Sequence, residues 1–192
     1  MTRTTLFITL CLLFASGFCF QAKGQDAAMG VYNSLKGFGI CTEVDGSDQD
    51  HERFNTYILS MDIYGMPMGR TERPGIKFNF SHNHVLVKGG RGGVDSQIYA
   101  GPGAAVGLVQ DRENSVASQS RLVNNPGVVA ALSGSAGMRM LFREHVLIDL
   151  SFTFEAGFHI RNDEWQDQRD LRFYSNGISR AWYPQLSILY KF

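Results

Sequence analysis

The sequence predicts an all-β protein, folded as a closed, antiparallel, up-and-down barrel of about eight strands. Three observations lead to this fold class. Apolar and polar residues alternate in several long segments, glycine and phenylalanine are frequent (21 and 14 of 192 residues), and no long segment has an amphipathic helical pattern. Alternation with a period of two indicates strands, because successive side chains leave a strand on opposite sides.

The clearest alternation runs from Val146 to Ile160, where every even-numbered residue is apolar and the odd-numbered ones after Leu147 are small or polar. Six further segments with a similar pattern are 37–44, 55–63, 75–87, 98–109, 128–142 and 182–192. An eighth strand is expected either at "AAMGVYN" (27–33) or at "LRFYSNG" (171–177), and the sequence does not decide between them. "REH", between Phe142 and Val146, predicts a tight hairpin turn.

The environment of the two faces separates a membrane barrel from a soluble β-sandwich. Several apolar strips span a dozen residues, whereas globular strands usually have about 5–6 and a tilted membrane strand needs about 9–11. The polar faces are rich in small residues, as a crowded lumen requires: Gly101, Gly103, Ala105, Gly107, Ser133, Ser135 and Gly137. We therefore predict a transmembrane barrel, with apolar side chains toward lipid and polar ones inside.

The N-terminus predicts export. Arg3 precedes the apolar run "LFITLCLLFASGFCF", and Ala22 and Gly24 supply the small residues that a signal peptidase reads. We expect residues 1–24 to be a cleaved signal peptide and residues 25–192 to form the barrel. The mature part then holds one cysteine, Cys41, which excludes an intramolecular disulfide. A formal net charge of zero gives no reason to expect a nucleic-acid partner.

The C-terminal strand carries a family resemblance. Its alternate apolar residues end on an aromatic at the last position: Trp182, Leu186, Ile188, Tyr190 and Phe192. This strand resembles the final strand of bacterial outer-membrane β-barrels, which the barrel-assembly machinery reads during biogenesis. Together with the signal peptide and the hairpin around residues 143–145, the whole mature chain is similar to the small outer-membrane barrels of the OmpX, OmpA-barrel and PorT-like types. The resemblance implies location in the outer membrane of a Gram-negative-type bacterium, contact with its lipid, and no particular activity.

The same alternation predicts which charged residues enter the lumen: Glu43, Asp62, Lys77, Arg139, Asp149, Glu155 and Lys191. Isolated charges in a narrow interior would cost several kcal/mol each, so we expect them to pair. Arg139 and Asp149 flank the tight turn at nearly equal distance, and are expected to be cross-strand or diagonal neighbours. An interior of eight strands is only wide enough for side chains, which predicts a plugged lumen rather than an open pore.

No catalytic, cofactor-binding or metal site is predicted. Ser151, Glu155 and His159 share a face of one strand, but Ser151 and His159 stand ~27 Å apart at ~3.4 Å per residue. His82 and His84 share the outer face, but the sequence offers no third ligand for a metal ion. We therefore expect these histidines to lie at the membrane–water boundary rather than in a metal site. The tight turn is expected to face the periplasm, and loops 66–74, 111–126 and 161–180 the exterior. Loop residues that could contact a partner are Trp165, Phe173 and Tyr174.

The leading hypothesis is thus a non-enzymatic outer-membrane barrel that is structural or binds a partner or ligand through its extracellular loops. Two alternatives are a lipid-modifying barrel enzyme and a secreted β-sandwich that acts as a binding module. Neither needs a cofactor.

Overall fold

A computed structural model describes residues 27–34, 37–46, 52–65, 69–112, 124–163, 168–175 and 184–192. Nine strands run through these residues: β1 (Ala27–Asn33), β2 (Gly37–Asp45), β3 (Arg53–Gly65), β4 (Gly69–Arg91), β5 (Val94–Arg112), β6 (Asn124–Phe142), β7 (Val146–Asp163), β8 (Gln168–Ser175) and β9 (Gln185–Lys191). In this part of the chain, no helix has the length and apolar character needed to cross a membrane.

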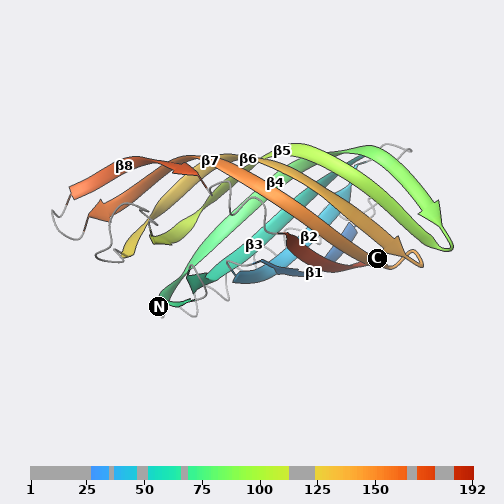
Figure 1. Ribbon diagram of the computed structural model, residues 1–192, viewed down its shortest axis with the longest axis horizontal. Coiled ribbons are helices and arrows are strands. Elements are labelled where there is room, and N and C mark those ends of the chain that lie inside the picture. Colours follow the sequence, from blue (N-terminus) through green and yellow to red (C-terminus); the bar gives the residue numbers. More distant parts are fainter. Residues whose placement is uncertain are drawn as a thin grey trace.

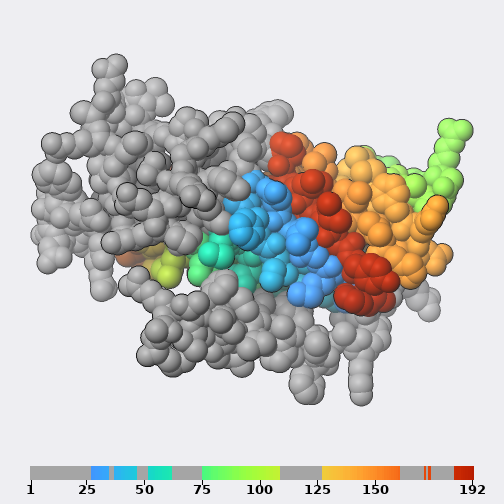
Figure 2. Space-filling model, turned by 90° about the horizontal axis from the view of Figure 1, so that it is seen from below, coloured from blue at the N-terminus to red at the C-terminus, as the bar shows by residue number. Residues whose placement is uncertain are grey.

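The strands form one closed antiparallel barrel (Figure 1). Strands β1 to β7 pair in chain order, β7 pairs with β9, and β9 returns to pair with β1. Figure 2 shows this closure as β1, in blue, lying against β9, in red. The predicted up-and-down barrel is confirmed. A β-sandwich is excluded because the described strands belong to one closed sheet rather than to two packed ones.

Nine strands occupy eight positions around the barrel because β8 and β9 share one side of β7. The first part of β7, Val146–Ser151, pairs with β9, and the later part, Ala156–Asp163, pairs with β8. Both candidates for the eighth strand are therefore strands. "AAMGVYN" is β1, and "LRFYS" belongs to β8, which continues the line of β9 along β7.

One end of the barrel, here called the turn end, holds turns 92–93 and 143–145 together with Phe192. Arg143–His145 closes the β6–β7 hairpin, with positive φ at Arg143 and Glu144 (47° and 67°). The amide of Phe192 donates to the carbonyl of Ala27 over 3.0 Å at the same end. The strand ends that flank 66–68, 113–123 and 164–167 lie at the opposite end, here called the loop end.

The predicted loops are shorter than expected. Strands continue through residues 69–74, 111–112, 124–126, 161–163 and 168–175, which lie within the predicted loops, although 171–175 also belonged to a candidate for the eighth strand. The polar composition misled the prediction, because the hydrogen bonds of a ladder join backbones and need no apolar side chains. Residues 66–68, 113–123, 164–167 and 176–180 of the predicted loops fall outside the described residues.

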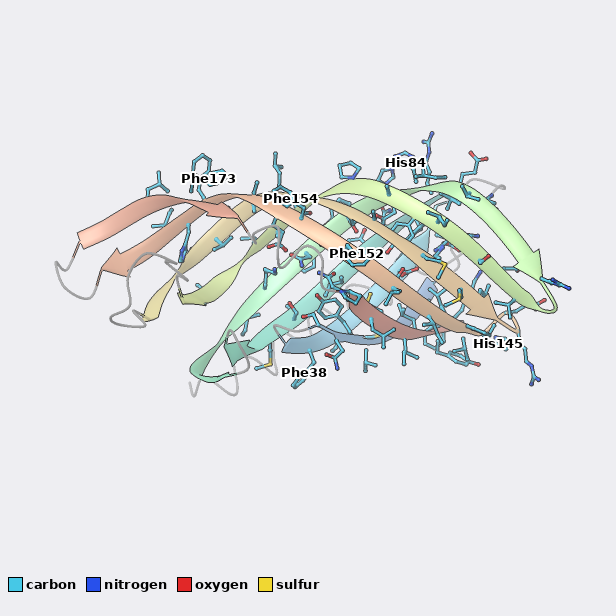
Figure 3. All side chains as sticks on the ribbon, viewed as in Figure 1. Phe38, His84, His145, Phe152, Phe154 and Phe173 are labelled. Atoms are coloured by element: carbon cyan, nitrogen blue, oxygen red, sulfur yellow. The ribbon has the colours of Figure 1, made fainter. Side chains whose placement is uncertain are left out.

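The barrel has an inside-out distribution of side chains. Phe152, Phe154 and Ile188 are 39%, 46% and 46% exposed on the outer wall, whereas Lys77 and Glu155 are 7% and 1% exposed within. Phe38 and Phe173 project outward from opposite sides in Figure 3. Small residues make room inside: a Cβ added at Gly137 would lie 2.7 Å from the hydroxyl of Tyr99.

Candidate functional site

Six of the seven charged residues predicted for the lumen point into the barrel. Five of them are buried: Glu43, Lys77, Arg139, Asp149 and Glu155. Lys191 is half-buried near the turn end. The backbone of Asp62 pairs with Gly37 of β2, but its side chain lies outside the described residues. The lumen therefore holds both signs of charge, contributed by strands from around the barrel.

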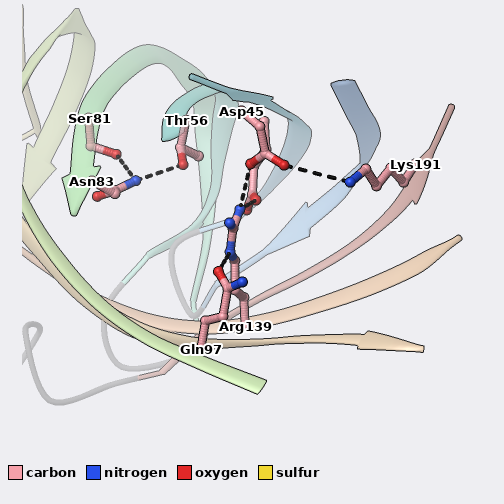
Figure 4. Close-up of polar contacts among 8 residues, drawn as sticks. Asp45, Thr56, Ser81, Asn83, Gln97, Arg139 and Lys191 are labelled. Atoms are coloured by element: carbon pink, nitrogen blue, oxygen red, sulfur yellow. Dashed lines mark hydrogen bonds and ion pairs between the residues drawn. The ribbon is translucent and has the colours of Figure 1, made fainter. Parts of the chain in front are cut away.

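Arg139 is the centre of the cluster nearest the turn end (Figure 4). Its Nη1 donates to Glu43 Oε2 over 3.2 Å and to Asp45 Oδ1 over 3.1 Å, and its Nε donates to Gln97 Oε1 over 2.8 Å. The guanidinium also lies over the ring of Phe54, 3.7 Å from its centroid. Hydrogen bonds to charged groups are stronger than neutral ones, and the planar guanidinium can engage several acceptors at once. Arg139 thus joins strands β2, β3, β5 and β6.

Lys191 extends this cluster to the last strand, because its Nζ lies 3.7 Å from Asp45 Oδ2. Asp45 therefore interacts with both cations. The sequence analysis missed Asp45 and Gln97. Gln97 shares the parity of the buried Tyr99, which was the available signal, whereas Asp45 sits at the end of β2 and looked like part of a polar turn.

The predicted neighbours Arg139 and Asp149 are directly opposite each other in the β6–β7 register. The hydrogen bonds of the guanidinium, however, reach Glu43 and Asp45 on the far wall. Asp149 instead lies beside the hydroxyls of Tyr99 and Ser151, and its Oδ2 is buried with no hydrogen-bond partner. In a narrow barrel, a long side chain can reach across the lumen as easily as along the wall, so adjacency in register does not decide ion pairing.

A second ion pair lies deeper in the barrel. Lys77 Nζ, from β4, is 2.7 Å from Glu155 Oε1 and 2.9 Å from Oε2, on β7. Two strands, β5 and β6, separate β4 from β7 in the sheet, so this pair bridges the lumen. The ammonium group thus has short contacts to both carboxylate oxygens.

A neutral network, also missed by the sequence analysis, fills the space beside these ion pairs. Asn83 Nδ2 donates to Thr56 Oγ1 over 2.9 Å and to Ser81 Oγ over 3.2 Å, and its Oδ1 accepts from Ser135 Oγ over 2.7 Å. Asn83 is fully buried. Its inward parity with Lys77 and Asn79 could have identified it, but amide residues carry no charge that demands a partner.

A pocket of about 220 Å³ opens at the turn end. It is lined by both signs of charge together with small and apolar residues: Ala28, Glu43, Asp45, Arg139, Leu147 and Lys191 among others. The pocket is the open outer part of the Arg139 cluster. It therefore does not form a separate site.

The C-terminal strand presents its predicted residues to the outside. Leu186, Ile188, Tyr190 and Phe192 are 41–78% exposed, while Trp182 lies outside the described residues. Tyr190 stacks on His145 of the tight turn, with ring centroids 5.7 Å apart, and meets the edge of Phe192 at 5.5 Å. These aromatic side chains collect at the turn end of the outer wall.

Two of the three predicted loop-contact residues lie in a strand. Phe173 and Tyr174 lie in β8, paired with Phe158 and Gly157 of β7, rather than in a loop. Phe173 is 73% exposed on the outer wall, and the side chain of Tyr174 lies outside the described residues, as does the whole of Trp165. The sequence analysis included "LRFYSNG" as a candidate strand but also counted it within the loop 161–180.

The serine, acid and histidine of β7 do point inward together. Ser151, Glu155 and His159 are all buried, but Glu155 is engaged by Lys77 and Ser151 is too far along the strand from His159 to touch it. No group of three or more metal-binding side chains occurs among the residues that the structure describes. Cys41 is a free, buried thiol.

Comparisons with known proteins add little. No family model matches the chain, and no curated protein matches it. Among solved structures, the chain is similar to a major outer membrane protein from Thermus thermophilus. The identity is 12%, the alignment covers 88% of this chain and 98% of that chain, and the TM-score is 0.44.

Proposed function

We propose that this protein is an integral outer-membrane β-barrel with a plugged lumen, and that it serves a structural or partner-binding role without catalysing a reaction. The single observation that carries the proposal is the inside-out sorting of side chains. Among the described residues, twenty-four large apolar side chains are exposed, and ion pairs are buried. In water, this outer wall would be an exposed apolar surface far larger than the patches of ordinary soluble proteins. In a membrane, the same surface contacts lipid acyl chains.

The plugged lumen is supported by the two levels of polar contacts. The Arg139 cluster fills the turn end, and Lys77–Glu155 bridges the interior beyond it. An eight-stranded barrel has an interior that side chains can fill, so no continuous water path is expected. We propose that such a barrel acts through its outer wall and through its loop end.

The remaining parts of the proposal concern location and biogenesis. Residues 1–24 would direct export, and the barrel-assembly machinery would read the C-terminal strand. The loop end would then face the exterior, because the longest junction, 113–123, is flanked by strand ends there, whereas turns 92–93 and 143–145 lie at the opposite end and periplasmic turns are the short ones. Loop residues there, including Trp165, remain candidates for contact with a protein partner or ligand.

The test uses the full chain expressed in a Gram-negative host. The protein should fractionate with the outer membrane and should migrate differently on a gel before and after boiling, as folded barrels do. Purified in detergent, it should give a β-type circular dichroism spectrum and no steady conductance in a planar bilayer. A monomer that is folded in water without detergent would contradict the membrane proposal, and steady conductance would contradict the plugged lumen.

Deletion of Phe192 separates the assembly signal from fold stability. Phe192 is 78% exposed, so its removal creates no cavity. We expect the deletion variant to reach the outer membrane poorly in cells, yet to refold in detergent as well as the parent chain. Leu186→Ala, which also trims an exposed residue of β9, is the matched control. Normal assembly of the Phe192 deletion would count against a role for the terminal residue.

A further inference from the structure

A polar cluster interrupts the apolar outer wall where β3 begins, beside the second half of β4. It consists of Arg53, Asn55, His82 and His84, here called the outer polar cluster. Arg53 is directly opposite His84, and Asn55 is opposite His82, in the β3–β4 register. Lys77, Asn79 and Asn83 of β4 are buried, so by alternation the even-numbered residues His82 and His84 belong to the outer face. His84 is visible on the outside of the barrel in Figure 3.

The two histidine rings are held in a defined arrangement. His82 Nδ1 lies 2.7 Å from Asn55 Oδ1, which fixes the plane of the ring and leaves Nε2 for another partner. The ring of His84 stands at 88° to that of His82, with centroids 4.9 Å apart. Arg53 is exposed beside them. Three side chains that can present N–H donors are thus collected on a wall that otherwise faces hydrocarbon.

An aromatic surface lies next to the cluster on the outer wall, further along β3 and β4 in the direction of the loop end. Tyr57 and Phe80 are opposite each other in the same register, with ring centroids 5.3 Å apart. On β5, Ala100 is the small residue opposite His84, and the exposed Pro102 follows it on the same face. The small side chains of β5 leave open space beside the histidines. A polar group of a ligand could lie on the cluster while its apolar part lies over Tyr57 and Phe80.

We propose that the outer polar cluster binds the phosphate of an anionic phospholipid at the membrane boundary, with an acyl chain lying over Tyr57 and Phe80. A phosphate accepts charge-assisted hydrogen bonds from a guanidinium and from imidazole N–H groups, and arginine matches its geometry well. The cluster lies where β3 begins, and the proposal places this level at the boundary between lipid head groups and hydrocarbon. This inference rests on the proposed membrane location.

The test compares three probes on the full chain refolded in detergent, with bound lipid counted by native mass spectrometry. Phosphatidylglycerol and diacylglycerol share their acyl chains and differ in the head group, and inorganic phosphate has no acyl chain. We expect phosphatidylglycerol to bind about tenfold more tightly than diacylglycerol, the scale of one charge-assisted hydrogen bond. Inorganic phosphate at millimolar concentration should not displace it.

The variant Arg53→Gln/His82→Gln/His84→Gln should lower phosphatidylglycerol affinity about tenfold, to that of diacylglycerol, and leave diacylglycerol binding unchanged. Arg143→Gln/His145→Gln removes the same residue types from the tight turn at the same end and is the matched control. Gel mobility before and after boiling checks that each variant is folded.

Several results would overturn the inference: equal binding of the two lipids to the parent chain, an undiminished preference in the triple variant, an equal loss in the control, or displacement by inorganic phosphate, which would mark a site for a free anion. A folded, membrane-inserted barrel with any of these results would reject the phospholipid site alone. A chain that folds in water without detergent would reject the proposed function as well.

Discussion

Lys77 Nζ and Glu155 Oε1 lie 2.7 Å apart across the lumen, on strands that are not neighbours in the sheet. Both side chains are almost completely buried. A buried ion pair is weak support for stability by itself, because desolvation of the two charges offsets their attraction. Its partners nevertheless depend on each other strongly, and this dependence can be measured.

Removing one partner should be far more damaging than removing both. Lys77→Met leaves the Glu155 carboxylate buried without its cation, and we expect the free energy of unfolding to fall by about 3–5 kcal/mol. The double variant Lys77→Met/Glu155→Leu should recover most of this loss. Urea unfolding in lipid vesicles, followed by tryptophan fluorescence, measures each value. Lys88→Met, at an exposed position of β4, is the control, and an additive double variant would show that the two side chains act independently.

Arg139 should not be replaceable by lysine. Arg139→Lys keeps the charge but cannot maintain the separate contacts of Nε and Nη1 with Gln97, Glu43 and Asp45. We expect a loss of about 1–3 kcal/mol in the free energy of unfolding, seen as a lower temperature of the gel-mobility shift. Arg143→Lys in the exposed turn should change stability by less than about 0.5 kcal/mol. Equal stability of the two variants would contradict the central position of Arg139.

The outer wall should resist charge most strongly in its middle. Phe154→Arg places a cation on the lipid-facing side of β7, and we expect a loss of about 2–4 kcal/mol, whereas Phe192→Arg at the turn end should cost about 0–1 kcal/mol. Phe154→Leu controls for loss of the ring. Unfolding in vesicles measures all three. If Phe154→Arg is as stable as Phe154→Leu, then lipid does not cover this part of the barrel.

Replacement by alanine should destabilise the barrel at one glycine and leave its stability unchanged at another. A Cβ at Gly101 would meet the backbone of His82 and lie 2.7 Å from the Cα of Asn83, while a Cβ at Gly134 has nothing within 4 Å. Gly101→Ala must therefore displace β4, and we expect a loss of about 1–3 kcal/mol and a reduced yield of folded barrel. Gly134→Ala should fold normally. The fraction of protein in the heat-modifiable form gives the comparison, and normal folding of Gly101→Ala would refute the close approach of β4 and β5.

Local alternation was sufficient to predict which face of each long strand lies on the outer wall and which lies in the lumen. Phe152, Phe154 and Phe158 of β7 are exposed on the outside, and Thr153, Glu155 and His159 are buried, as the period of two requires. The pattern was weaker where strands are short. β1 and β8 have 7 and 8 residues, which is too few for alternation to stand out from chance, so only one of them was expected.

The partners inside the lumen could not be predicted from the same pattern. The alternation places Arg139 and Asp149 on one face and the hairpin places them side by side, but it does not show that Glu43 and Asp45 arrive from the opposite wall. That proximity depends on the curvature of the closed sheet. Likewise, the outer polar cluster joins β3 and β4 at a register that the intervening polar segment does not reveal.

The seam between the first and last strands has a mechanical consequence. β1 and β9, which meet there, have 7 residues each, whereas β5 and β6 on the far side have 19 each. The β1–β9 seam is therefore held by six residue pairs, whereas the β5–β6 ladder has nineteen. A force that pulls the two ends of the chain apart would separate β1 from β9 first. The longer ladders between β4 and β7 would separate last.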